Sequence, residues 1–354
     1  MLARLLILLI TLLCSACQHA DDKQAHVSQG VLDEADLLMA SRYFDQASQT
    51  ANSVIPTLTE LVTKHPENTD IQLLLVRAHL LTFLAENALL IDQSPPRTQS
   101  LIRIPRMNEY KDYDTHVKPA LDTLIKLANS DTKFSFEQQA FIYGNIAAIF
   151  RLSPDTAERS VTEYDKAIAA YRSWRQELEA PKSKIQSNKY ALERIDNQIR
   201  AMLMAQAEAG LLAEEWSKCL DSLQSAAGGT DLQFFTVHFG QLEQRKAVLE
   251  TKVRNEEASG DSQPKRLLSM AKQRAKQSGN KRDEIASYSP YQAELIFTRA
   301  ELNDLQNNLA YRIICLHRLN RIQERDAART TLRAFYPDME AKVSAALQIQ
   351  ENKR

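Results

Sequence analysis

Hydrophobic residues recur every three or four positions along most of the chain, the spacing that places them on one face of an α-helix. No run of alternating β-branched residues interrupts this pattern. We therefore expect an all-α protein. The pattern predicts helices over Val31–Ser48, Ile55–Lys64, Ile71–Ile91, Thr115–Ala128, Ser135–Arg151, Thr156–Glu179, Lys182–Ala213, Glu215–Ala226, Leu232–Asn255, Tyr291–Leu319, Ile322–Phe335 and Asp338–Glu351.

The segment Ile71–Ile91 is apolar on nearly every side and is long enough to cross a membrane. Arg77, His79 and Glu86 lie within it, and ionisable groups are costly at the centre of a bilayer. A helix that is hydrophobic all round is also typical of the core of a large protein. We therefore expect this helix to be buried among its neighbours, and Asn68, Thr69 or Asp70 to cap its start.

Breaks in the pattern suggest the domain organisation. A proline-containing insertion at 94–107 includes Leu101, Ile102 and Ile104, and we expect it to fold back onto the helices. The stretch 256–290 is rich in charged and small residues and reads as a linker or long loop. We expect a signal peptide over 1–16, a tether over 17–30, a helical repeat domain over 31–255, the linker over 256–290, and a C-terminal helical hairpin and final helix over 291–354, packed on the repeat domain.

The amino-acid composition supports a helical fold and excludes some classes of partner. Eight glycines in 354 residues is scarce, whereas β-turns and phosphate-cradling loops depend on glycine. The formal net charge is −1, and it becomes −2 when residues 1–16, which contain Arg4, are removed. This balance argues against nucleic acid as a partner. We expect no cofactor.

The first residues have the layout of a secretory signal: Arg4, an apolar run from Leu5 to Leu13, then small residues. The run is too short for the roughly 20 residues that span a bilayer. Cys14-Ser15-Ala16-Cys17 resembles the lipobox of bacterial lipoproteins, Leu-(Ala/Ser)-(Gly/Ala)-Cys, with cysteine in place of leucine. The resemblance implies cleavage after Ala16 and acylation of Cys17, and several acyl chains give stable anchoring. The alternatives are an ordinary cleaved signal peptide and an N-terminus that is apolar by chance.

The residues that follow Cys17 indicate in which membrane the anchor lies and how far the folded part can extend from it. Gln18 stands where an aspartate would resemble an inner-membrane retention signal, so the resemblance implies the periplasmic face of the outer membrane. The polar stretch Gln18–Gly30 reads as a flexible tether that reaches roughly 20 Å as a random coil.

Three helix pairs resemble tetratricopeptide repeats. Small, aromatic and large apolar residues fall at the expected places in Ala207–Ala226, Leu316–Pro337 and Gly144–Trp174. The resemblance implies antiparallel helical hairpins that stack as a solenoid, each hairpin burying its apolar face on the next. A non-repetitive, irregular helical bundle is the alternative.

We find no sequence pattern of a known catalytic or metal site in the mature chain, and expect no enzyme and no metal ion. Cys219 and Cys315 lie on apolar helix faces and are expected to act as small hydrophobes, although an exported protein could join them in a disulfide. The basic stretch 264–282 could contact an anionic lipid surface or an acidic partner, or it could be a solvated helix or loop. Its cations are Lys265, Arg266, Lys272, Arg274, Lys276, Lys281 and Arg282.

These observations favour a lipid-anchored periplasmic scaffold or adaptor that binds a protein or peptide partner in the cell envelope. An alternative rests on Lys64–Asn68 and the apolar helix after it, which are similar to the T-component lipoproteins of TRAP transporters. That resemblance implies helices around an apolar cavity, so an apolar cleft lined by Leu80, Phe83 and Leu84 would favour it. An unidentified envelope enzyme is the third hypothesis.

Overall fold

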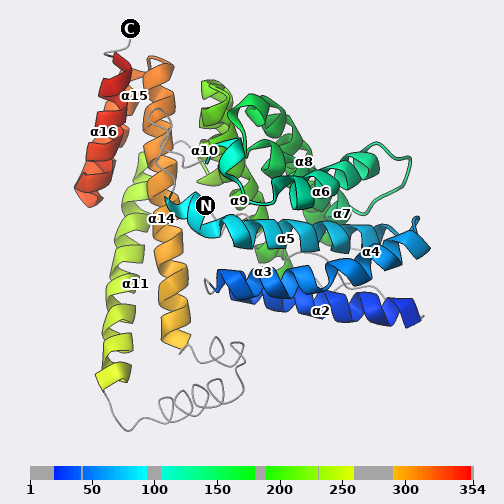
Figure 1. Cartoon of the computed structure of the whole chain (residues 1–354). Helices are drawn as coiled ribbons and strands as arrows, with labels where there is room; N and C mark the ends of the chain where they lie inside the picture. The colour runs from blue at the N-terminus through cyan, green and yellow to red at the C-terminus, as the bar shows by residue number, and fades with distance from the viewer. Residues whose placement is uncertain are drawn as a thin grey trace. The chain divides into compact units, whose positions relative to one another are not determined.

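The computed structural model describes residues 20–40, 43–93, 105–179, 189–229, 231–258 and 290–351. These residues are almost entirely α-helical and include no β-strand, which confirms the expected all-α class (Figure 1). The chain divides into two compact units, with the boundary between Ala226 and Ala227.

The first unit is built from helices that contact their neighbours in chain order. Helix α3 contacts α2 and α5, and each later pair in the series α5, α6, α7, α8, α9 and α10 is in contact. Short 3₁₀ turns, Met107–Glu109 and Pro154–Thr156, precede α6 and α8. The helices are α2 (Ala20–Ala40), α3 (Phe44–Ser53), α4 (Ile55–Lys64), α5 (Thr69–Gln93), α6 (Tyr113–Ala128), α7 (Phe136–Phe150), α8 (Ala157–Glu179), α9 (Lys189–Leu212) and α10 (Trp216–Ala226).

The second unit is a long helix pair that two shorter helices cover. Helix α11 (Leu232–Ala258) lies along α14 (Pro290–Arg318), and α15 (Ile322–Phe335) and α16 (Pro337–Glu351) contact α14. The ring of Phe239 touches the rings of Phe235, Phe335 and Tyr336, with centroids 5.0–5.9 Å apart. These aromatic side chains close the core between α11 and α15.

Several predicted helices are confirmed at or near their bounds. Helices α4 and α15 begin and end at the predicted residues, and α5 is two residues longer at each end. The side chain of Asn68 accepts a hydrogen bond from the backbone N–H of Ile71, so it is the cap of α5. Helix α5 has the length and composition of a membrane-spanning segment, but most of it is buried inside the first unit, as expected for a core helix.

The predicted helix Val31–Ser48 is in fact parts of two helices. Helix α2 ends at Ala40 and α3 begins at Phe44, after Tyr43 has left helical geometry. The chain reverses here so that both α2 and α3 can bury their apolar faces on α5. The periodicity continues in register across the turn, which is why it concealed the break.

The tether expected over 17–30 is helical where the structure describes it. Helix α2 begins at Ala20, and its residues Ala25 and Ser28 are buried. These two positions continue the spacing of Leu32 and Ala35 on the same face, so packing overrides the polar composition. Residues 17–19 lie outside the described residues.

The boundary between the units falls earlier than the end of the expected repeat domain at 255. Helix α11 contacts α14 and α15 and therefore belongs with the C-terminal helices. The turn Gly228-Gly229, where both residues have positive φ, lies close to the actual boundary. The central part of the expected linker, residues 259–289, lies outside the described residues.

Candidate functional site

The strongest candidate sites from the sequence lie outside the described residues. This holds for Ala16 and Cys17 of the lipobox, and also for the basic stretch, with Lys265, Arg266, Lys272, Arg274, Lys276, Lys281 and Arg282. Their assignments therefore stay predictions.

Cys219 and Cys315 lie in different units. Cys219 is buried in α10 and Cys315 is buried in α14, each with no exposed surface. No disulfide joins these two thiols in the described part of the chain. Both side chains therefore fill core positions as small hydrophobes.

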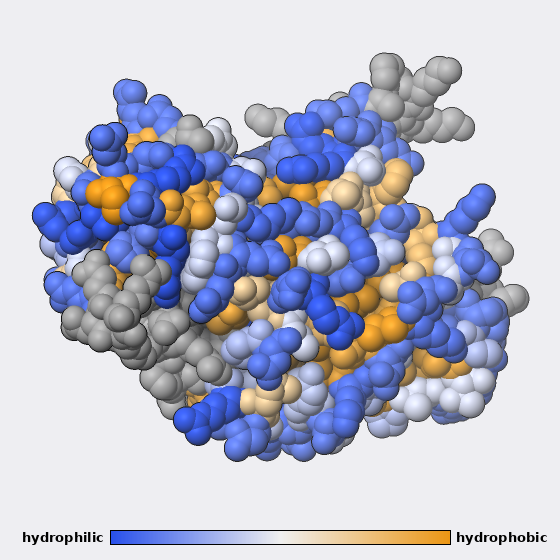
Figure 2. Space-filling view, turned by 90° about the horizontal axis from the view of Figure 1, so that it is seen from above, coloured by the Kyte–Doolittle hydropathy of each residue, from blue (hydrophilic) through white to orange (hydrophobic). Residues whose placement is uncertain are grey.

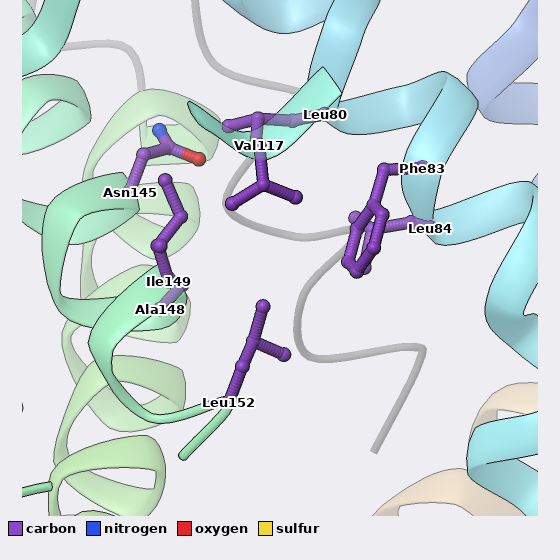
Figure 3. A pocket seen from close by; sticks show the side chains of 8 residues that line it. All are labelled: Leu80, Phe83, Leu84, Val117, Asn145, Ala148, Ile149 and Leu152. Carbon is purple, nitrogen blue, oxygen red and sulfur yellow. The ribbon is translucent and has the colours of Figure 1, made fainter. Parts of the chain in front are cut away.

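Helices α5, α6 and α7 enclose an apolar cleft in the first unit. Figure 3 shows Leu80, Phe83 and Leu84 of α5 on one side, with Val117 of α6 beside them. The opposite side is formed by residues at the end of α7 and just beyond it, namely Asn145, Ala148, Ile149 and Leu152. The three α5 residues are those that the sequence named for such a cleft.

The cleft is small. The centre of a water-sized sphere can occupy about 20 Å³ of this cleft. A cavity that holds a single water has roughly 10–15 Å³ by the same measure. Drug-sized ligands occupy pockets of roughly 300 Å³ or more. In this conformation the cleft therefore has room for one methyl or methylene group, and a larger ligand requires α5 and α7 to separate.

Two asparagines fix the backbone around the cleft. The side chain of Asn87 donates to the backbone carbonyl of Lys111 at 3.0 Å and accepts from its N–H at 2.7 Å, which ties α5 to the segment before α6. Asn145 is buried and its side-chain amide donates to the carbonyl of Phe141 at 2.7 Å, within its own helix. One of the two N–H groups of this amide is thus committed to the backbone.

Beside the cleft, two histidines meet between α5 and α6. Their Nδ1 atoms are 3.1 Å apart, so one neutral imidazole donates to the other. Burial, and then the neighbouring His116, lower the pKa of His79 to about 4. Burial also lowers the pKa of His116, although Glu86 and Asp112 act in the opposite direction. Sequence reasoning missed this contact, because the two histidines are 37 residues apart and meet only through the register of their helices.

Buried ion pairs fix the helices that form the cleft. Arg77 of α5 reaches Asp33 and Asp36 of α2, and Arg151, which follows α7, pairs with Glu208 of α9. Burial raises the pKa of Asp36 to about 6, even though Arg77 lowers it. These pairs constrain the positions of α5 and α7, because a buried charge that lost its partner would be costly.

The described residues offer little chemistry besides binding. Among them, no group of three or more histidine, cysteine, aspartate or glutamate side chains could hold a metal ion. Burial raises the pKa of Glu137 to about 7, while Arg194 lowers it. The closest atoms of this pair are 3.7 Å apart, at the start of α7, away from the cleft. The cleft walls carry no nucleophile, and what they can do is bind an apolar group.

Hydrophobic side chains also reach the outer surface. On the face that Figure 2 shows, apolar patches are interspersed with hydrophilic residues. In the first unit, Leu89 of α5 is 54% exposed, and Val27 and Met107 are exposed as well. These side chains provide apolar contacts that a protein partner could cover.

Comparison with protein-family models, curated proteins and solved structures finds no match to this chain. What the cleft or the surface binds therefore has to be inferred from its own geometry.

Proposed function

We propose that the protein is a lipid-anchored scaffold of the cell envelope that binds a protein or peptide partner. Its anchor is the acylated Cys17, and its location is the periplasmic face of the outer membrane. The lipobox-like stretch that ends at Cys17 and the residue Gln18 after it support the anchor and the location.

The chain-order packing of the first unit carries the scaffold proposal. Two of the three segments that resemble tetratricopeptide repeats correspond to the contacting pairs α7–α8 and α9–α10 of this unit, and the third corresponds to α14–α15 of the second unit. In the pair α9–α10 the helices approach closely at Gly210, which lies against Cys219. Series of such pairs expose one long surface to a partner, and a partner that lies on it contacts several helices at once.

The anchor is tested by a matched pair of serine variants. Cys17→Ser should abolish the incorporation of labelled fatty acid and release the protein from membranes. Cys14→Ser should leave both unchanged, because that residue departs with the signal peptide. Acylation that persists in the Cys17→Ser variant would contradict the proposal.

The partner is tested by photo-crosslinking in intact envelopes. A photoreactive amino acid at exposed Leu89 reports on the first unit, and one at exposed Val248 of α11 is the matched control in the second. We expect a defined crosslinked partner at position 89. Recovery of the protein alone at both positions would count against a scaffold.

The apolar cleft favours a second function, the ligand-binding component of a transport system. Leu80, Phe83 and Leu84 line it, as the resemblance to TRAP T-components implies. A fluorescent fatty acid titrated into the protein tests this idea. Ala148→Leu should fill the cleft and weaken binding, whereas Ala169→Leu, on the exposed side of α8, should not. Equal binding by both variants would remove the cleft as the site.

A further inference from the structure

The start of α2 lies very close to the proposed lipid anchor. Helix α2 begins at Ala20, so only Gln18 and His19 separate it from Cys17. Three residue steps span at most about 10 Å even when fully extended. If Cys17 is acylated, as the proposed function requires, Ala20 is held within this distance of the lipid headgroups.

Helix α2 is also firmly attached to the first unit. Leu32 and Ala35 have no exposed surface. The guanidinium group of Arg77, in α5, binds the carboxylate of Asp33 at 2.7 Å and that of buried Asp36. Any constraint on the start of α2 is therefore a constraint on the whole unit.

The start of α2 marks one end of the first unit. Figure 1 shows it at the same end as the turn between α4 and α5. The loop between α6 and α7 is at this end too, because Gln138 at the start of α7 donates to Asp70 at the start of α5, at 2.9 Å. We call the start of α2, the turn 65–68 and the loop 129–135 the anchored end.

Other contacts define the far end. Ser48, in the middle of α3, donates to Glu86, late in α5, at 3.1 Å. Ser160, early in α8, donates to the carbonyl of Ala147, late in α7, at 2.7 Å. The 15 residues of α7 separate the two ends by about 22 Å, at 1.5 Å per residue.

We propose that the first unit stands end-on on the lipid bilayer, with the anchored end facing the headgroups. The alternative orientation would lay the flank formed by α2, α3 and α4 on the membrane. Anionic headgroups oppose it, because carboxylates outnumber lysines among the described side chains of this flank. The carboxylates with full or partial exposure are Asp33, Glu34, Asp45 and Glu60, against Lys64.

Fluorescent labels on introduced cysteines test this orientation. Cys219 and Cys315 are fully buried, and acylation blocks Cys17, so a thiol reagent should label the introduced residue selectively. Glu67→Cys places a label at the anchored end. Asp45→Cys places one at the far end of the α2–α4 flank, and Asp155→Cys one at the far end beside α8; all three native side chains are exposed.

The acylated full chain is reconstituted into phosphatidylethanolamine–phosphatidylglycerol vesicles that carry a quencher on their headgroups. We expect loss of fluorescence at position 67 and none at positions 45 and 155. A flexible Gly-Ser segment inserted between Gln18 and His19 should restore the fluorescence at position 67, because it frees α2 from the anchor.

Each contrary outcome has a distinct meaning. Equal quenching at positions 45 and 67 would show that the unit lies on its flank, and equal fluorescence at all three positions would show that it has no fixed orientation. Both results overturn the proposal while the vesicles still carry the protein in a flotation assay. Protein that does not float with the vesicles has no anchor, and this result would overturn the proposed function as well.

Discussion

Two ion pairs of the first unit and two of the second join helices in different environments. In the first unit, the side chains of Arg151 and Glu208 are 3% and 4% exposed, and Arg77 with Asp36 is similarly enclosed. In the second unit, the pairs Arg245–Glu294 and Arg299–Glu250 join α11 to α14, with side chains 36–57% exposed. Among these four pairs, the buried ones constrain the positions of their helices, whereas the solvated ones contribute little to stability.

What closes the second unit is an aromatic cluster. Phe239 has no exposed surface and contacts three other rings. Both tryptophans of the chain, Trp174 and Trp216, are in the first unit. Tryptophan fluorescence therefore reports the unfolding of the first unit, whereas far-UV circular dichroism reports that of both, which allows the two cores to be tested separately.

The largest effect is expected from breaking the buried ion pair. Arg151→Met leaves Glu208 charged and enclosed, which should lower the free energy of unfolding by about 3–5 kcal/mol. Urea titration measures this loss, followed by tryptophan fluorescence for the first unit and by far-UV circular dichroism for the control in the second. Arg299→Met is the matched control and should cost about 0–1 kcal/mol, because its pair is solvated. Similar losses in the two variants would erase the contrast between the units.

Removing the central aromatic ring should destabilise the second unit alone. Phe239→Ala deletes a fully buried side chain and should cost about 3–5 kcal/mol. We expect the transition seen by circular dichroism to split, with an earlier phase for the second unit, while the tryptophan transition stays in place. A common shift of both signals would mean that the units unfold as one.

Replacing a glycine by alanine should lower the stability of the first unit at one position and raise that of the second unit at another. A Cβ at Gly210 would lie 3.1 Å from the Cβ of Cys219 and 3.3 Å from its backbone. Overpacking costs about 1–3 kcal/mol and outweighs the better helix propensity of alanine. At Gly240, on α11, nothing lies within 4 Å, so alanine should stabilise by about 0.5–1 kcal/mol. Thermal unfolding of both variants checks the signs.

The last comparison concerns the response of the first unit to acid. Folding lowers the pKa values of His79 and His116, so below the ordinary histidine pKa the unfolded chain binds more protons than the folded one. Stability from these groups is complete above pH 6.5 and is lost as the pH falls toward 4. The raised pKa of Asp36 acts in the opposite direction. The difference between the wild type and His79→Gln should therefore isolate the histidine contribution, and parallel pH profiles would contradict it.

Periodicity predicted the helices well because each apolar face is a local property of the sequence. The bounds of α4 and α15 and the cap at Asn68 needed only local rules. The break between α2 and α3 and the helical start at Ala20 needed tertiary information, because packing on α5 decides both. The boundary at Ala226 was missed for a similar reason: α11 is next to α10 in sequence but contacts α14.

For the candidate site, sequence reasoning found the α5 face of the cleft and not the rest. Leu80, Phe83 and Leu84 share one side of a helix, which a pattern can show. The opposing Ile149 and the contact between His79 and His116 depend on how three helices align. The pairing of Arg151 with Glu208, separated by 57 residues, has no signal in a single sequence for the same reason.

If the chain is exported as proposed, the thiols of Cys219 and Cys315 can be oxidised until folding buries them. Exposed thiols are oxidised in an oxidising compartment. Burial protects Cys219 and Cys315 only after their helices have packed together. Cys219 belongs to a unit of neighbouring helices, whose local contacts form quickly. Burial of Cys315 requires α11 to pair with α14, whose contacting residues are 49 positions apart in the sequence. Mass spectrometry during refolding with glutathione disulfide should therefore find Cys315 modified before Cys219.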